Sequence, residues 1–292
     1  MKSLFVGSNG VRAGWRVLAF FAIAIVLLFG LQLLVVPFAA QLLHLDGGTL
    51  NAPAFVLAEV VESIVVLVAT GALARFERRR IDAFGLPVRR AFGGRFGEGV
   101  ALGVASAGLV ALVMIALGGM VVGGIALHGG ELVADALLWA LVMLLVGLNE
   151  EYLFRGYALQ TLARGIGFWP AAVLLSLFFG VAHLTKPHEN IFDIANIVLL
   201  GLLLCFTVSR TGSLWLAVGF HFAFDFMQFF VIGTRNGGAQ PVGHLLQVTF
   251  PGPAWLTGGA LGTEASFLML PAIALLAFYV SLRYPQTVAL ET

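Results

Sequence analysis

Three short patterns of ionisable side chains interrupt otherwise apolar stretches of the sequence. They are Glu150-Glu151-x-x-x-Arg155, Phe179-x-x-x-His183 and His221-x-x-x-Asp225. Residues four apart lie on one face of a helix, so the ends of each pattern are neighbours. An ionisable group inside a bilayer costs at least ~2.5 kcal/mol on insertion scales, which makes each group a candidate for function. Carboxylates and imidazoles together indicate acid–base chemistry.

Within the first pattern, Glu150 is the better candidate for a chemical base. Glu151 and Arg155 form an i,i+4 pair, and this pairing neutralises one of the two carboxylates. Glu150 is rotated by about 100° from Glu151 on a helix of 3.6 residues per turn, so it has no partner within its own helix. We therefore expect Glu150 to be available for proton transfer.

A helical hairpin would bring the first two patterns to one level. If two helices turn at Gly165–Gly167, Glu150 and His183 both lie about 25 Å from the turn at ~1.5 Å per residue. Asp225 lies about 20 Å from a second turn near residue 211 by the same measure. With modest helix tilt, we expect Glu150, His183, His221 and Asp225 to meet in one polar site.

The composition requires that these patterns lie on membrane helices. The 292 residues are 60% hydrophobic and 11% charged, with a mean hydropathy of +1.00, whereas soluble domains carry about 25% charged residues. This excludes a soluble globular protein. The apolar runs do not alternate, which excludes a transmembrane barrel, and the single cysteine, Cys205, excludes a disulfide scaffold. The net charge of +1 gives no indication of a nucleic-acid partner.

The predicted fold class is all-α, with about eight transmembrane helices around an intramembrane polar cavity. We predict one integral membrane domain over residues 1–292, with its motif-bearing core at about 132–232. The expected spans lie near 17–39, 53–74, 98–124, 132–154, 168–184, 191–209, 213–232 and 266–282.

The distribution of basic residues predicts the orientation of these spans. Eight spans place 14 of the 16 basic residues on one side of the membrane, which the positive-inside rule identifies as cytoplasmic. We therefore predict a multi-pass protein of the cell membrane with both termini cytoplasmic. The basic segment 75–97 should lie against the anionic cytoplasmic leaflet. The segment 234–264, rich in Gly and Pro, should be an irregular outer loop.

Other polar and aromatic residues allow more than one interpretation. Packing contacts or cavity lining both fit Glu59, Glu62, Asp193 and Asn196. No role is assigned to the histidines of outer loops or span ends, His44, His128, His188 and His244. Aromatic side chains could line a cavity for a hydrophobic ligand, although such residues usually serve packing; these are Phe222, Phe224, Phe229 and Phe230.

Taken in order, the three patterns resemble the motifs of the CAAX protease and bacteriocin-processing family, which includes the Ras-converting enzyme and bacterial relatives. The likeness covers about residues 132–232 and includes Thr211–Trp215 before the third pattern. It implies a glutamate-dependent intramembrane endopeptidase that needs neither cofactor nor metal. The implied catalytic residues are Glu150 and His183, which activate water, and His221 with its neighbour Asp225, which stabilise the oxyanion. The implied supporting residues are Glu151, Arg155 and Phe179.

The residue at 225 departs from the pattern of the Ras-converting branch, which has asparagine there. Asp225 is either protonated in a low-dielectric cavity or orients His221 as an acceptor. The implied substrate is a hydrophobic or prenylated peptide or protein within the lipid bilayer.

Two other classes of function fit the same side chains. One is a metal-dependent membrane protease, because Glu, His and Asp can bind Zn²⁺. The other is a non-catalytic membrane protein, either a proton-coupled transporter or an immunity-type factor that binds a peptide.

Overall fold

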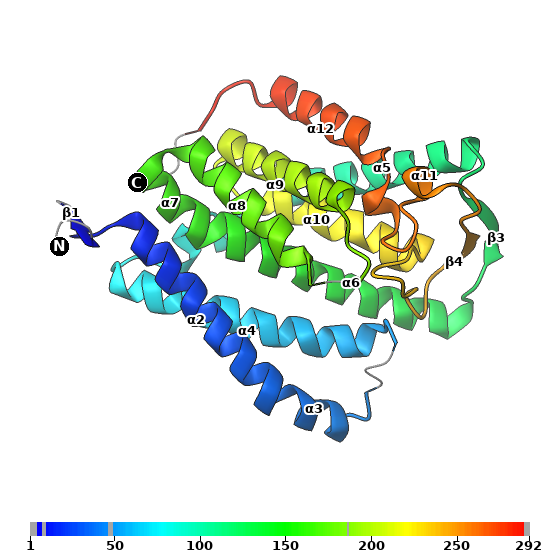
Figure 1. Cartoon of the computed structure of the whole chain (residues 1–292), viewed down its shortest axis with the longest axis horizontal. Coiled ribbons are helices and arrows are strands. Elements are labelled where there is room, and N and C mark those ends of the chain that lie inside the picture. Colours follow the sequence, from blue (N-terminus) through cyan, green and yellow to red (C-terminus); the bar gives the residue numbers. More distant parts are fainter. Residues whose placement is uncertain (1–4, 8–9, 46–48, 186, 289–292) are drawn as a thin grey trace.

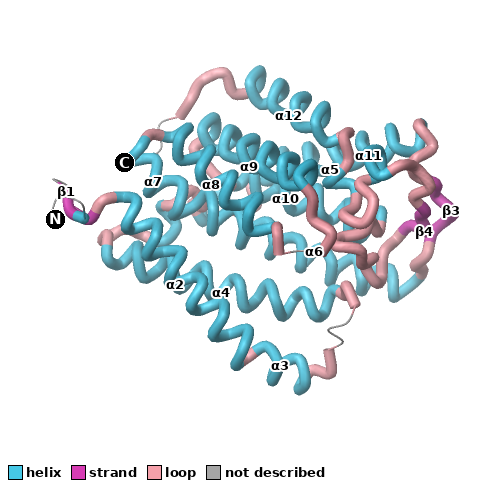
Figure 2. Tube along the Cα trace, in the orientation of Figure 1, coloured by secondary structure: helices cyan, strands magenta, loops and turns pink. Residues whose placement is uncertain are grey.

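The chain folds into a bundle of membrane-length helices. The computed structural model describes residues 5–7, 10–45, 49–185 and 187–288, and is 72% helical. Two basic residues of the charge pattern, Lys2 and Lys186, lie outside the described residues. Figure 2 shows that helices form nearly the whole body and that strands occur only at its two ends. The predicted all-α polytopic membrane fold is confirmed.

Apolar helices run through the whole described chain (Figure 1). They are α2 (Ala13–Leu34), α3 (Val36–Leu42), α4 (Ala52–Phe76), α5 (Gly94–Ala116), α6 (Gly129–Glu151), α7 (Leu159–Ile166), α8 (Phe168–His183), α9 (Ile191–Thr211), α10 (Trp215–Phe226) and α12 (Met269–Arg283). Six continuous helical stretches of the described residues are long and apolar enough to cross a membrane, and α8 and α12 are shorter apolar helices. These eight segments correspond to the eight predicted spans, although several boundaries differ.

Short elements join the helices. The strands are β1 (Val6–Gly7), β2 (Gly10–Val11), β3 (Val121–Ile125) and β4 (Leu246–Thr249). The pairs β1–β2 and β3–β4 are both antiparallel. The remaining short helices are η1 (Ile81–Ala83), η2 (Val88–Arg90), α11 (Ala254–Thr257) and η5 (Thr263–Ala265).

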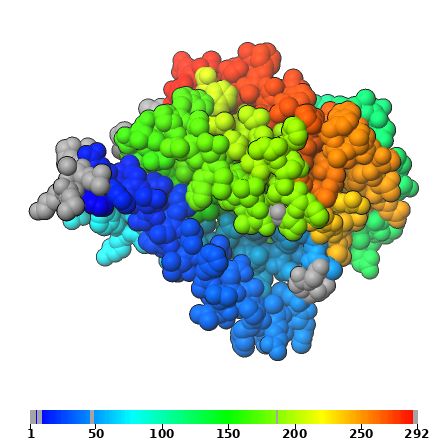
Figure 3. All heavy atoms as spheres, in the orientation of Figure 1, coloured from blue at the N-terminus to red at the C-terminus, as the bar shows by residue number. Residues whose placement is uncertain are grey.

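Two predicted spans and one predicted loop need correction. The first span is interrupted at Val35, because Pro37, the second residue of α3, has no N–H group to continue the hydrogen bonds of α2. The helix α3 stands out with the lower part of α2 along one side of the body (Figure 3). The span predicted over 98–124 ends as a helix at Ala116, and its last residues form β3. The segment 234–264 is not wholly irregular, since β4 pairs with β3. Apolar composition alone does not distinguish a strand of this ribbon from the end of a helix.

The helices that carry the first and third patterns both continue into π-helix. The segment η3 (Tyr152–Ala158) follows α6, and η4 (Met227–Ile232) follows α10. Gly156 has non-helical dihedral angles within η3, so α6 and α7 are not one straight helix. The straight hairpin assumed from the sequence is therefore wrong, although the turn into α8 is at Gly167, as expected.

The basic segments predicted to be cytoplasmic meet at one end of the bundle. Arg16 and Arg164 lie 3.0 and 4.0 Å from the carboxylate of Glu77. Arg95 donates to the Thr211 carbonyl at 2.6 Å. In Figure 1, β1 and the end of α7 lie at this end, whereas β3 and β4 lie at the opposite end. This arrangement agrees with an even number of crossings.

Close contacts made by glycine fix α10 against its neighbours. A Cβ atom on Gly99 would lie 2.2 Å from the Leu216 carbonyl oxygen, and one on Gly219 would lie 2.2 Å from the Phe96 carbonyl oxygen. Gly147 of α6 faces the backbone of α10 beside His221. Small residues let membrane helices approach closely, and here they hold the third pattern next to the first.

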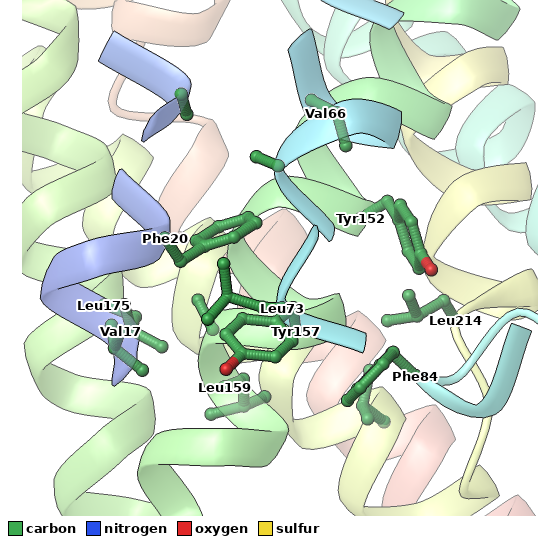
Figure 4. Packing of buried hydrophobic residues seen from close by; sticks show 14 of the residues in the cluster. Val17, Phe20, Val66, Leu73, Phe84, Tyr152, Tyr157, Leu159, Leu175 and Leu214 are labelled. Atoms are coloured by element: carbon green, nitrogen blue, oxygen red, sulfur yellow. The ribbon is translucent and has the colours of Figure 1, made fainter. Parts of the chain in front are cut away.

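A second contact region joins α2, α4, α8 and the segment after α6. Figure 4 shows the rings of Phe20, Phe84 and Tyr157 together with Leu73 and Leu159. Phe20, Phe84 and Tyr157 are fully buried. This packing anchors the bent segment that follows the Glu150 helix, so the bend is a fixed feature of the fold.

Candidate functional site

The polar side chains of the three patterns line one cavity inside the helix bundle. The cavity has a volume of about 230 Å³ and receives Glu150 from α6, His183 from α8, and His221 and Asp225 from α10. Its apolar wall includes Phe179, Leu200, Leu204 and Met269. Mixed walls of this kind allow an extended apolar ligand to reach a few convergent polar groups.

Glu151 points away from the cavity into a buried ion pair. Its Oε1 lies 3.1 Å from Arg155 Nη1, and both side chains are almost completely buried. The same oxygen lies 2.9 Å from Nδ1 of His221. A carboxylate paired with arginine accepts hydrogen bonds, so Nδ1 carries the proton and donates it to Glu151. Glu151 thus links the first pattern to the third, a contact that helical spacing within one helix does not reveal.

The other nitrogen of His221 faces two carboxylates of the cavity. Its Nε2 lies 3.7 Å from Glu150 Oε2 and 3.4 Å from Asp225 Oδ2. His221 and Asp225 are both buried, whereas 26% of the Glu150 side chain is exposed. Glu150 is therefore the carboxylate of this group that is most accessible from the cavity.

His183 is fixed by its own helix. Its Nδ1 lies 2.8 Å from the Phe179 carbonyl oxygen. A carbonyl only accepts, so Nδ1 carries the proton and the lone pair is on Nε2. The Phe179 ring packs edge-on against the imidazole at 4.6 Å, and the Arg155 guanidinium lies over the same ring at 4.6 Å. Phe179 thereby separates the buried arginine from His183.

The structure places every residue of the three patterns in or beside the cavity. Glu150, His183, His221, Asp225 and Phe179 line it, and the last two pattern residues, Glu151 and Arg155, lie behind its wall and hold His221 in place. Of the four aromatic residues considered from the sequence, Phe229 lines the cavity. The other three pack in apolar clusters.

Several polar groups outside the patterns also line the cavity. Glu59 of α4 lines it and also accepts a hydrogen bond from Asn149 of α6 at 3.0 Å, so cavity lining and a packing contact both apply to this residue. Asn196 lines it and donates to the Glu264 carbonyl. Glu264 was not among the predicted site residues, because it lies in the predicted outer loop. Its position immediately before the last apolar span is the one signal that could have indicated it.

The cavity combines proton acceptors, imidazoles and amides from separate helices. Among the residues that the structure describes, no group of three or more His, Cys, Asp or Glu side chains is disposed to hold a metal ion. The arrangement suits acid–base chemistry on a bound water or on a polar group of a ligand.

The fold and the cavity define the class: a polytopic helical membrane protein with a polar site inside the bundle. Residues 132–227 match the model of the family described as Type II CAAX prenyl endopeptidase Rce1-like. This match is consistent with the CAAX protease and bacteriocin-processing family. The resemblance inferred from the three patterns is confirmed, and this family supports an intramembrane protease function. The match includes all three patterns and covers about a third of the chain.

A curated relative matches nearly the same length of chain. It is an uncharacterized 24.3 kDa protein of Escherichia coli, which is 33% identical over 98 residues. The match covers 32% of this chain and 44% of the relative, so the chain spans less than half of the relative's length. Glu59 and Glu264 lie outside the residues that match the family.

Proposed function

We propose that this protein is an intramembrane endopeptidase that hydrolyses a peptide bond with a water molecule activated by Glu150 and His183. The observation that carries the proposal is the convergence of Glu150, His183, His221 and Asp225 from three helices on one membrane cavity. The family match supports a protease. The substrate would be a hydrophobic or prenylated peptide, whose scissile bond would reach the polar groups past the apolar wall of the cavity.

The hydrogen bonds of the two proposed water-activating residues suit this role. The His183 tautomer puts the lone pair on Nε2, which can accept a hydrogen bond from water. Glu150 is the exposed carboxylate of the site and can take the proton as the water oxygen attacks the scissile carbonyl. The same proton would pass to the leaving amine, so that the products are an acid and an amine and no covalent intermediate forms.

His221 and Asp225 would stabilise the oxyanion that forms during this attack. Glu151 fixes the ring of His221 through Nδ1, which leaves Nε2 to face the cavity. A protonated Nε2 can donate to the oxyanion. Asp225 lies 3.4 Å from this atom and would accept this hydrogen before the oxyanion forms, which keeps the ring oriented toward the cavity.

The proposal is tested by cleavage of peptides with the purified full chain in lipid nanodiscs. A panel of prenylated and unprenylated hydrophobic peptides should include at least one that is cut, and cutting should persist after exhaustive chelation. Stoichiometric metal lost together with activity would replace the proposal with a metalloprotease. Absence of cleavage across the panel, combined with proton-coupled uptake that depends on Glu150, would replace it with a transporter.

Substitution of Asp225 by asparagine tests the role of that residue. The asparagine side chain has a similar size and retains a hydrogen-bond acceptor beside His221, so Asp225→Asn should keep the cleavage rate within about tenfold of the natural protein. Asp225→Leu removes the acceptor and serves as the contrasting variant. If Asp225→Asn and Asp225→Leu lose activity equally, the carboxylate itself takes part in the chemistry.

The orientation in the membrane is a second part of the proposal. We propose that the end of the bundle with Glu77, Arg95 and Arg164 is cytoplasmic, because it gathers the basic residues. Cysteines at Thr287 and Arg89, in a Cys205→Ala background, should resist an impermeant thiol reagent added to intact cells. A cysteine at Gln247, near the opposite end, should react. Labelling of the first two positions and protection of the third would show that the protein has the opposite orientation in the membrane.

A further inference from the structure

The end of the bundle that carries the basic residues contains a second cavity, separate from the polar site. This arginine pocket has a volume of about 590 Å³ and is lined by Arg90, Arg95, Arg283, Trp215, Tyr284 and Glu98. Three arginines, from η2, from α5 and from the end of α12, therefore line one space. None of them belongs to the three patterns.

The arginine pocket has a net positive charge because three arginines line it together with a single acidic residue, Glu98. The Glu98 carboxylate accepts hydrogen bonds from the hydroxyls of Tyr279 and Tyr284 at 2.9 and 2.7 Å. Arg283 approaches it only to 4.0 Å, and 59% of the Arg283 side chain is exposed. Arg90 is exposed and has no acidic partner among the described residues. Guanidinium groups in such a cluster are suited to bind phosphate oxygens.

An apolar groove lies next to the arginine pocket, shares Trp215 with it as a wall, and reaches toward the middle of the membrane. It has a volume of about 490 Å³ and is lined chiefly by Val66, Leu67, Leu86, Val88, Leu145 and Leu148. Trp215 lines both spaces, and η2 contributes Val88 to the groove and Arg90 to the pocket. At ~1.5 Å per residue, Val66 lies about 15 Å along α4 from its end at Phe76. The groove is thus deep enough for part of an acyl chain.

The surface around the shared wall has the composition of a membrane interface. Val88 and Phe92 are 69% and 57% exposed, and they flank two arginines along the same segment. Exposed apolar side chains beside arginine and tryptophan are typical of the level of the lipid headgroups. An occupant of both spaces must therefore be anionic at one end and apolar at the other.

We propose that the arginine pocket and the apolar groove together bind one anionic phospholipid. Its phosphate would lie among Arg90, Arg95 and Arg283, and one acyl chain would lie along α4 and α6. The proposal does not depend on protease activity, since binding is measured directly. A basic surface attracts an anionic leaflet in general, whereas this proposal assigns one phospholipid to one site lined by named residues.

The test is native mass spectrometry of the delipidated full chain titrated with phosphatidylglycerol or with phosphatidylcholine of the same acyl chains. Phosphatidylglycerol should bind as a single tight equivalent, and phosphatidylcholine should bind more weakly. Arg90→Gln and Arg283→Gln should each weaken phosphatidylglycerol binding by about tenfold or more, because each removes a charge-assisted hydrogen bond to the phosphate. Thermal unfolding of each variant checks that the bundle is intact.

Arg89→Gln is the matched control because Arg89 is the neighbour of Arg90 on η2 but does not line the pocket. It removes the same charge but no hydrogen bond to the phosphate, and it should leave the affinity within about twofold of the natural protein. An equal loss in Arg89→Gln and Arg90→Gln would overturn the proposal in favour of diffuse attraction. Displacement of the lipid by an equal concentration of soluble glycerol phosphate would also overturn it, because the acyl chain would then contribute nothing.

Discussion

Replacement of Glu150 by glutamine should lower the rate of peptide cleavage by about 10³-fold or more, within the range expected when a general base is lost. Glutamine keeps the size of the side chain but cannot accept the proton of water. Glu150 is partly exposed to the cavity and makes no ion pair shorter than 3.7 Å to His221 in the described structure, so the variant should unfold at the same temperature as the natural protein. The measurement is the single-turnover cleavage rate in nanodiscs.

Glu131→Gln is the control for this prediction. Glu131 is an exposed carboxyl residue in the first turn of the same helix, α6, and does not line the cavity, so its substitution should change the rate by less than about twofold. Combining Glu150→Gln with His183→Ala should cost little beyond the larger single effect, because parts of one catalytic unit are not additive. Retention of activity in Glu150→Gln together with its loss in Glu59→Gln would move the base to Glu59.

Replacement of Arg155 by methionine should destabilise the protein by about 3–5 kcal/mol, the usual effect of removing one partner from a buried ion pair. Glu151 is fully buried, and no other arginine or lysine of the described chain lies within ion-pair distance of its carboxylate. The variant should also lose cleavage activity because Glu151 holds His221 through Nδ1. Chemical unfolding in detergent micelles measures the first effect.

A second substitution separates stability from activity. In the double variant Glu151→Gln with Arg155→Met, the buried carboxylate is gone, so most of the lost stability should return. Activity should remain low, since a glutamine does not hold His221 as an ionised acceptor does. Arg80→Met serves as the control because that arginine is 84% exposed, and its substitution should leave the unfolding midpoint unchanged. A double variant as unstable as Arg155→Met would show that the ion pair is not the cause.

Helical spacing predicted local contacts well and contacts between helices only in part. The pair Glu151–Arg155 and the pair His221–Asp225 each join residues four apart, and the structure shows both. The contact of Glu151 with His221 joins α6 to α10. It depends on glycine packing at the helix interface, which a linear count of residues along each helix cannot supply.

The spans themselves were predicted from the sequence, but several of their boundaries were not. Apolar length located the eight segments because hydrocarbon thickness sets how many residues a helix needs. It did not locate the break at Val35, the strand β3 or the bend at Gly156. These features depend on which backbone groups find partners in neighbouring segments. The same limit concealed Glu264, because a loop that folds back over the cavity has no periodic pattern.

Because a π-helical segment follows α6, the number of residues in this part of the chain determines where Arg155 lies. A π turn contains about one residue more than an α turn, and it behaves as a single-residue insertion within a helix. Arg155 lies inside this segment, so deletion of one residue between Glu151 and Arg155 would regularise the helix and rotate the guanidinium by about 100°. In related sequences that align here without a gap, the arginine should lie where Arg155 lies and pair with the glutamate that holds the histidine. In a sequence with a one-residue gap, another residue should hold the histidine that corresponds to His221.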